Sequence, residues 1–136
     1  SEYASSCIDT SDGLFNALNT VSDVNETGYV IDTIPYPEVC IQKAEELSLP
    51  ADVFFFGECG EYELLFSVPR EKEERLMQAA DGTSMEIIRI GRVCSADARK
   101  AALQTGQRDV SDFSLRARDI NDPAEYTETL LTWLQT

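Results

Sequence analysis

Apolar residues in this chain never form a long uninterrupted run, and this limits the structures that it can adopt. The longest apolar stretch, residues 53–56 (Val-Phe-Phe-Phe), is followed at once by Gly57. A helix that crosses a bilayer needs about 20 apolar residues, so we expect no membrane-spanning segment and no membrane partner. A short apolar run that ends at a glycine is typical of a buried strand, and we predict one over residues 53–56.

Helix-like and strand-like segments alternate unevenly along the 136 residues. A first helix is predicted over residues 11–26, because Leu14, Leu18 and Val21 recur on one helical face. Further strands are predicted at residues 29–34, 62–68, 85–93 (a central strand), 101–104 and 114–118, and further helices from Pro37 and Pro69. The expected fold is α+β, a mixed β-sheet with helices packed on it, and the length suits one domain over residues 1–136.

The last helix has the clearest start signal in the sequence. Asp122 is a typical N-cap residue, and Pro123 follows it at the first helical position. Tyr126, Leu130, Trp133 and Leu134 then recur at helical spacing. We therefore predict a C-terminal helix that buries this stripe of side chains against the sheet.

The chain is strongly acidic, with a net charge of −14 and only 11 lysines and arginines. A nucleic-acid-binding protein needs clustered basic residues that neutralise phosphates, so no nucleic-acid partner is expected. The excess of carboxylates has two interpretations. It either keeps the protein in solution or includes ligands for divalent cations.

Four cysteines, at positions 7, 40, 59 and 94, lie far apart in the sequence. No two are spaced as Cys-x-x-Cys and the chain has no histidine, so a zinc site is improbable. We expect four reduced, buried thiols in a cytoplasmic protein. The start Ser-Glu-Tyr has no apolar signal region and no methionine, and we therefore expect a processed chain or a piece of a longer one.

Two segments concentrate residues that can carry chemistry. Residues 9–14 (Asp-Thr-Ser-Asp-Gly-Leu) place two carboxylates and a hydroxyl where the first helix is expected to begin. They are either ordinary helix caps and turn residues or ligands of a magnesium ion, which takes one or two carboxylates and completes its shell with water and phosphate oxygens. Residues 56–66 (Phe-Gly-Glu-Cys-Gly-Glu-Tyr-Glu-Leu-Leu-Phe) combine glycines and acids before a strand, which is typical of a hairpin or of a loop that approaches a ligand.

Together the two segments resemble those of the thiamine-monophosphate kinases and their aminoimidazole-ribonucleotide (AIR) synthetase relatives. The family carries an Asp-x-Ser-Asp-Gly-Leu segment at the start of a helix in its C-terminal domain, and residues 9–14 match it fully. Some fifty residues later it carries Gly-Gly-Glu-Asp-Tyr-Glu-Leu-Leu-Phe, whose last five residues match residues 62–66. The resemblance covers roughly residues 4–93 and implies the fold of the AIR synthetase C-terminal domain.

The resemblance also implies roles for single residues. Asp9 and Asp12 correspond to magnesium-binding carboxylates, and Ser11 with Gly13 to the nucleotide contact. The substrate contacts correspond to the segment that contains Glu58, Gly60 and Glu61. An ungapped match places Gly60 at the family's substrate-binding glutamate. With a local shift of the alignment, Glu61 or Glu58 supplies that carboxylate instead. The family's closing aromatic segment is not recognisable among residues 109–119.

The implied function is that of an ATP- and magnesium-dependent phosphotransferase acting on a small-molecule phosphate. In the family an N-terminal domain supplies most ATP contacts and forms the dimer, and we expect it to be missing from this chain. The chain alone is then expected to be inactive and to need that domain, or a homodimer partner. The alternative is a non-catalytic member of the superfamily that binds a small-molecule phosphate or a protein.

Overall fold

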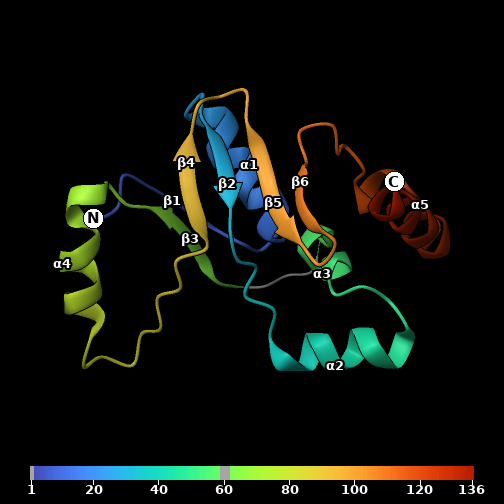
Figure 1. Cartoon of the computed structure of the whole chain (residues 1–136), viewed down its shortest axis with the longest axis horizontal. Helices are drawn as coiled ribbons and strands as arrows, with labels where there is room; N and C mark the ends of the chain where they lie inside the picture. The colour runs from blue at the N-terminus through green and yellow to red at the C-terminus, as the bar shows by residue number, and fades with distance from the viewer. Residues whose placement is uncertain (1, 59–61) are drawn as a thin grey trace.

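The computed structural model describes residues 2–58 and 62–136 and has an α+β architecture (Figure 1). In chain order its elements are β1 (Ser6–Asp9), α1 (Leu14–Val24), β2 (Gly28–Ile31), α2 (Glu38–Leu47), α3 (Asp52–Phe56), β3 (Leu64–Ser67), α4 (Arg70–Ala80), β4 (Gly91–Cys94), β5 (Arg99–Leu103), β6 (Gly106–Asp109), the 3-10 turn η1 (Ala117–Asp119) and α5 (Pro123–Gln135). In this described part no helix is long and apolar enough to cross a membrane.

A four-stranded mixed sheet in the order β4-β2-β5-β6 forms the centre of the fold. Strand β2 pairs antiparallel with β4 and parallel with β5, and β5 and β6 form an antiparallel hairpin. All four residues of β2 are buried, as expected for a strand with neighbours on both sides. The predicted mixed sheet with packed helices is confirmed.

A second, two-stranded sheet pairs β1 with β3 in antiparallel register. Asp9, the last residue of β1, faces Leu64, the first residue of β3. The pairing continues one step further, because the Thr10 amide donates to the Glu63 carbonyl over 3.0 Å. This sheet therefore brings the two segments singled out in the sequence side by side.

Helix α1 packs behind the four-stranded sheet, and α4 and α5 lie at opposite ends of the molecule (Figure 1). The core between these elements is rich in aromatic rings. Its buried members are Phe15, Leu18, Tyr29, Ile31, Phe55, Phe56, Ala101, Leu103, Val110, Phe113, Leu130 and Leu134. Residues from the first helix, the sheet and the last helix thus share one continuous hydrophobic cluster.

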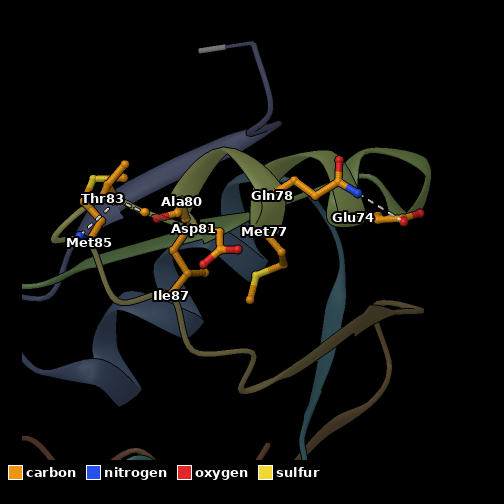
Figure 2. A pocket seen from close by; sticks show the side chains of 9 residues that line it. Glu74, Met77, Gln78, Ala80, Asp81, Thr83, Met85 and Ile87 are labelled. Atoms are coloured by element: carbon orange, nitrogen blue, oxygen red, sulfur yellow. Dashed lines mark hydrogen bonds between the residues drawn. The ribbon is translucent and has the colours of Figure 1, made fainter.

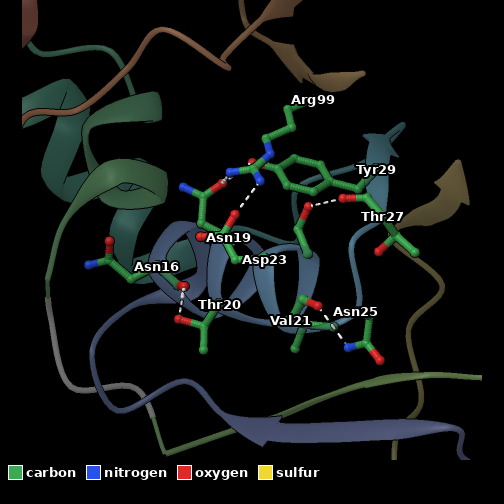
Figure 3. A network of polar contacts seen from close by, with 10 residues as sticks. Asn16, Asn19, Thr20, Val21, Asp23, Asn25, Thr27, Tyr29 and Arg99 are labelled. Carbon is green, nitrogen blue, oxygen red and sulfur yellow. Dashed lines mark hydrogen bonds and ion pairs between the residues drawn. The ribbon is translucent and has the colours of Figure 1, made fainter. Parts of the chain in front are cut away.

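A polar network fixes α1 to the sheet (Figure 3). The Tyr29 hydroxyl donates to Asn19 Oδ1 over 3.0 Å, and the Arg99 guanidinium donates to the same oxygen over 3.1 Å. Arg99 also forms an ion pair with Asp23. Burial raises the pKa of Tyr29, so its hydroxyl keeps the proton that it donates.

The predicted first and last helices are confirmed with small shifts at their ends. Helix α5 begins as expected: Asp122 Oδ1 accepts a hydrogen bond from the Ala124 amide over 2.9 Å, and Pro123 occupies the first turn. Leu130 and Leu134 are buried. A carboxylate at the N-cap and a proline at the first position both favour the start of a helix, which is why this local signal was sufficient.

Residues 53–56 are not the predicted strand but lie in helix α3. Phe55 and Phe56 are adjacent in sequence and both buried, whereas neighbours in a strand point to opposite faces. The buried carboxylate of Asp52 accepts hydrogen bonds from the Tyr36 hydroxyl (2.8 Å) and from the Gln104 amide (3.0 Å). These contacts, distant in sequence, fix the helical turn.

Three further sequence predictions are wrong in part. The expected central strand over residues 85–93 forms only at β4, an edge strand, and Met85 and Ile88 are exposed. No strand forms over residues 114–118, because the partner of β5 is residues 106–109. The thiols of Cys7, Cys40 and Cys94 are free, as expected, but none of the three is fully buried: Cys7 is exposed, and Cys40 and Cys94 are partly buried. Cys59 lies outside the described residues.

Candidate functional site

The first motif forms a turn between β1 and α1. Asp9 ends β1, and Gly13 is the N-cap of α1 without any side-chain cap hydrogen bond. Asp9 Oδ1 instead accepts hydrogen bonds from the Ser11 amide (3.0 Å) and the Ser11 hydroxyl. None of these side chains caps α1; Asp9 and Ser11 instead form a local turn, the other half of the ordinary interpretation. Both Asp9 and Asp12 are exposed, so their carboxylates are open to solvent.

The electrostatics of this turn keep a negative charge at Asp9. The hydrogen bonds from the Ser11 hydroxyl and amide hold the pKa of the Asp9 carboxyl below its ordinary value. Hydrogen bonds that stabilise the charged form lower the pKa of an acid. Asp9 is therefore ionised at neutral pH and presents a hard oxygen ligand.

The second motif begins at Phe56, the last residue of α3, and continues through Gly57 and Glu58. Gly60 and Glu61, which the resemblance assigns to the substrate, lie outside the described residues. A Cβ atom built on Gly13 would lie 2.2 Å from the Gly57 carbonyl oxygen and 3.5 Å from the Glu58 Cα. The two motifs, more than forty residues apart in sequence, are therefore in direct backbone contact at Gly13 and Gly57.

An aromatic cluster fixes the segments that carry the site. Phe15 follows the first motif and Phe56 is the first residue of the second, and their ring centroids are 4.9 Å apart. Phe113, from the segment after β6, packs on both rings at 5.3 and 4.4 Å. Because each ring lies within a few residues of a site segment, the packing of the core sets the geometry of the site.

Arg118 is a member of this site that the sequence did not identify. It lies in η1, five residues after Phe113. Its Nε is 3.6 Å from Glu58 Oε2, and its Nη2 is 3.8 Å from Asp12 Oδ2. No sequence motif surrounds it, and the hydrophobic pattern around Phe113 is the only signal that could have placed it near the motifs.

The Glu58 carboxylate is mostly enclosed, with its side chain 15% exposed. Its Oε1 atom is buried and accepts no hydrogen bond from the described residues. Within these residues no group of three or more acidic, histidine or cysteine side chains is placed to hold a metal ion. Asp9 and Asp12 are thus a pair of candidate ligands that needs further oxygen ligands from elsewhere.

Two larger hollows lie away from these residues. One, of about 490 Å³, lies between α4 and the segment that follows it and is lined by Met77, Asp81 and Ile87 among others (Figure 2). The other, of about 560 Å³, lies between the β5–β6 turn and the end of α5. Neither includes a residue of the two motifs, so the candidate site is defined by its contacts and not by either hollow.

Replacing Gly13 with alanine tests whether the contact between the motifs matters. Gly13 has φ +91°, and a Cβ there would meet the Gly57 oxygen, whereas Gly82 has φ +80° and nothing within 4 Å of its Cβ position. Gly82→Ala should therefore cost only the backbone strain, about 1–2 kcal/mol. We expect Gly13→Ala to cost at least about 1 kcal/mol more, because overpacking adds to the strain. Urea unfolding of both variants measures the difference, and equal losses would contradict a tight contact.

The sequence matches no family model and no curated protein. The fold is nevertheless similar to two solved structures. Over 74% of this chain it resembles thiamine-monophosphate kinase from Stenotrophomonas maltophilia K279a, with a TM-score of 0.63 and 20% identity. Over 73% of this chain it resembles the protein tt0281 from Thermus thermophilus, with a TM-score of 0.62 and 24% identity. The match spans 32% of the length of either protein, and within that portion this chain has the fold of a thiamine-monophosphate kinase.

Proposed function

We propose that this chain is the C-terminal domain of an ATP-dependent, thiamine-monophosphate-kinase-like enzyme, and that it contributes magnesium-nucleotide and substrate contacts but is inactive alone. The observation that carries the proposal is the backbone contact between Gly13 and Gly57. It brings the candidate metal ligands of the first motif next to Glu58. The fold similarity to a thiamine-monophosphate kinase supports the same assignment.

Asp9 and Asp12 are the proposed magnesium ligands. Both are exposed carboxylates at one turn, and the pKa of Asp9 is lowered. Two hard oxygen donors suit Mg²⁺, which fills the rest of its octahedral shell with water and substrate phosphates. When bound, the ion would neutralise charge that develops on the transferred phosphoryl group. Ser11 orients Asp9 through its hydroxyl, and Ser11 and Gly13 are the proposed nucleotide contacts.

The substrate side of the proposed site is the segment after α3. Glu58 lies beside the first motif, and Gly60 and Glu61 follow it in sequence. We propose that this segment contacts a small-molecule phosphate. The chain is proposed to act in the cytoplasm, with an N-terminal domain or a homodimer partner that supplies the remaining ATP contacts. The two matched proteins are about three times longer than the matched portion, which leaves room for such a domain.

A transfer assay tests the proposal. The chain alone should give no transfer of phosphate from ATP to thiamine monophosphate, because the ligands that align both reactants are incomplete. Adding the N-terminal domain, in trans or as the longer natural chain, should produce magnesium-dependent transfer. Absence of transfer in that assembly, with thiamine monophosphate and with other small-molecule substrates of the superfamily, would instead support the non-catalytic binding domain. The Arg118 cation at Asp12 is the observation that favours this alternative.

A further inference from the structure

Arg118 connects the two motifs through one guanidinium group. Its Nε faces Glu58 Oε2 at 3.6 Å, and its Nη2 faces Asp12 Oδ2 at 3.8 Å. Asp12 is also a proposed magnesium ligand. The positively charged guanidinium of Arg118 therefore lies beside the Asp12 carboxylate that the metal would need, on the side that faces Glu58.

The contacts of Arg118 hold it only loosely. Both distances are longer than the 2.7–2.9 Å of a charge-assisted hydrogen bond, and the Arg118 side chain is 53% exposed. In the part of the chain that the structure describes, this side chain makes no hydrogen bond. Arg99 and Arg108, by contrast, each donate two hydrogen bonds. Several N–H donors of Arg118 are therefore free to bind another group.

Glu58 and Asp12 differ as partners of Arg118. The Glu58 carboxylate is mostly buried and has an oxygen without a donor among the described residues, whereas the Asp12 side chain is 74% exposed. An enclosed carboxylate retains a cation more strongly than a solvated one, because water screens it less. The contact at Nε is thus the more persistent one, and the contact at Nη2 is the one that exchanges.

We propose that Arg118 receives the anionic phosphate of the substrate, and that it neutralises Asp12 until a divalent cation takes its place there. The inference rests on the proposed function, since it assumes a metal at Asp9 and Asp12. With Mg²⁺ at Asp12, the guanidinium of Arg118 would leave that carboxylate by charge repulsion, while Glu58 would keep its Nε in position. The edge of the Arg118 guanidinium that no longer faces Asp12 then offers paired N–H donors, which match the geometry of a phosphate. The metal and the phosphate thus bind cooperatively through one arginine.

The test uses Arg118→Gln and, as a matched control with the same charge change two residues away, Arg116→Gln. Amide NMR shifts of residues 9–13 report binding at the site itself, which matters because a chain of net charge −14 attracts Mg²⁺ everywhere. With Mg²⁺ alone, Arg118→Gln should bind about three- to tenfold more tightly than the original chain, since a competing charge about 4–6 Å away is lost. With Mg²⁺ present, its affinity for inorganic pyrophosphate should fall about tenfold.

Arg118→Gln should raise the affinity for Mg²⁺ and lower the affinity for pyrophosphate, and these opposite changes separate the proposed role from a merely structural one. A variant with a damaged fold would lose both affinities, and circular dichroism with urea unfolding identifies that case. Arg118→Lys, which keeps the charge, should then retain the pyrophosphate affinity better than Arg118→Gln does. If the original chain binds Mg²⁺ at residues 9–13 but Arg118→Gln changes neither affinity, or Arg116→Gln changes both equally, the inference is wrong and the proposed function stands. If the original chain binds no Mg²⁺ there even with pyrophosphate, the inference is wrong, and the transfer assay with the N-terminal domain present decides the proposed function.

Discussion

Phe56→Ala is expected to lower the free energy of unfolding by about 3–5 kcal/mol, the usual cost of truncating a core phenylalanine. The Phe56 side chain is 2% exposed. Its ring packs on Phe113 at 4.4 Å, on Phe15 at 4.9 Å and on Trp133 at 5.2 Å. Removing it leaves a cavity where three segments meet. Urea unfolding should show a midpoint lower by about 1–5 M, given the usual slope of about 1–3 kcal/mol per molar urea.

Phe54→Ala provides the matched control, because it lies in the same short helix and removes the same ring. Phe54 is only half-buried and is not part of the central core cluster. Its loss should cost clearly less, about 1–2 kcal/mol, since less area returns to water. Similar losses for the two variants would mean that the aromatic cluster does not dominate the stability of this region.

The first and last helices were predictable because their signals are local. A carboxylate, a proline and a periodic apolar stripe near Asp122 all belong to α5 itself. The α3 region was not predictable in this way, because a run of four apolar residues fits a strand and a buried helix equally well. What decides its conformation is the long-range bonding of Asp52 to Tyr36 and Gln104.

The overestimated strand at residues 85–93 has a similar cause. Its isoleucines suggest a strand buried on both faces, but the segment pairs only with β2 and lies at the edge of the sheet. The strand forms only over residues 91–94, and Ile88 remains exposed. The hydrophobic pattern of a segment does not report how many pairing positions the sheet offers, so the position of this strand required the structure.

The candidate site was predictable as far as its motifs reach. The resemblance singled out Asp9, Asp12 and Glu58 as candidate site residues, and the structure adds the contact of Gly13 with Gly57 that brings their segments together. Arg118 was not predictable, because its position depends on the packing of Phe113 against Phe15 and Phe56. Contacts between residues so far apart in sequence leave no local pattern.

Asp12→Asn is expected to lower phosphate transfer about 100-fold or more in the assembly of this chain with the proposed N-terminal domain. Loss of a metal ligand that acts on the transition state costs several kcal/mol, and each 1.36 kcal/mol is about tenfold in rate. The fold should be unaffected, because the ion pair between Asp12 and Arg118 is long and largely exposed, and such pairs contribute about 0–1 kcal/mol to stability.

Asp81→Asn is the control for this substitution, since it makes the same change in charge at the exposed C-terminal end of α4, outside the two motifs. It should leave the rate of transfer within about twofold, as expected for a surface change away from a site. The metal dependence sharpens the comparison, because a weakened magnesium site should recover part of its rate at higher Mg²⁺ concentration. Recovery in Asp12→Asn, with no such response in Asp81→Asn, would assign the loss to metal binding. A rate unchanged by Asp12→Asn would remove the metal role from this turn, even though its contact with Gly57 and Glu58 would persist.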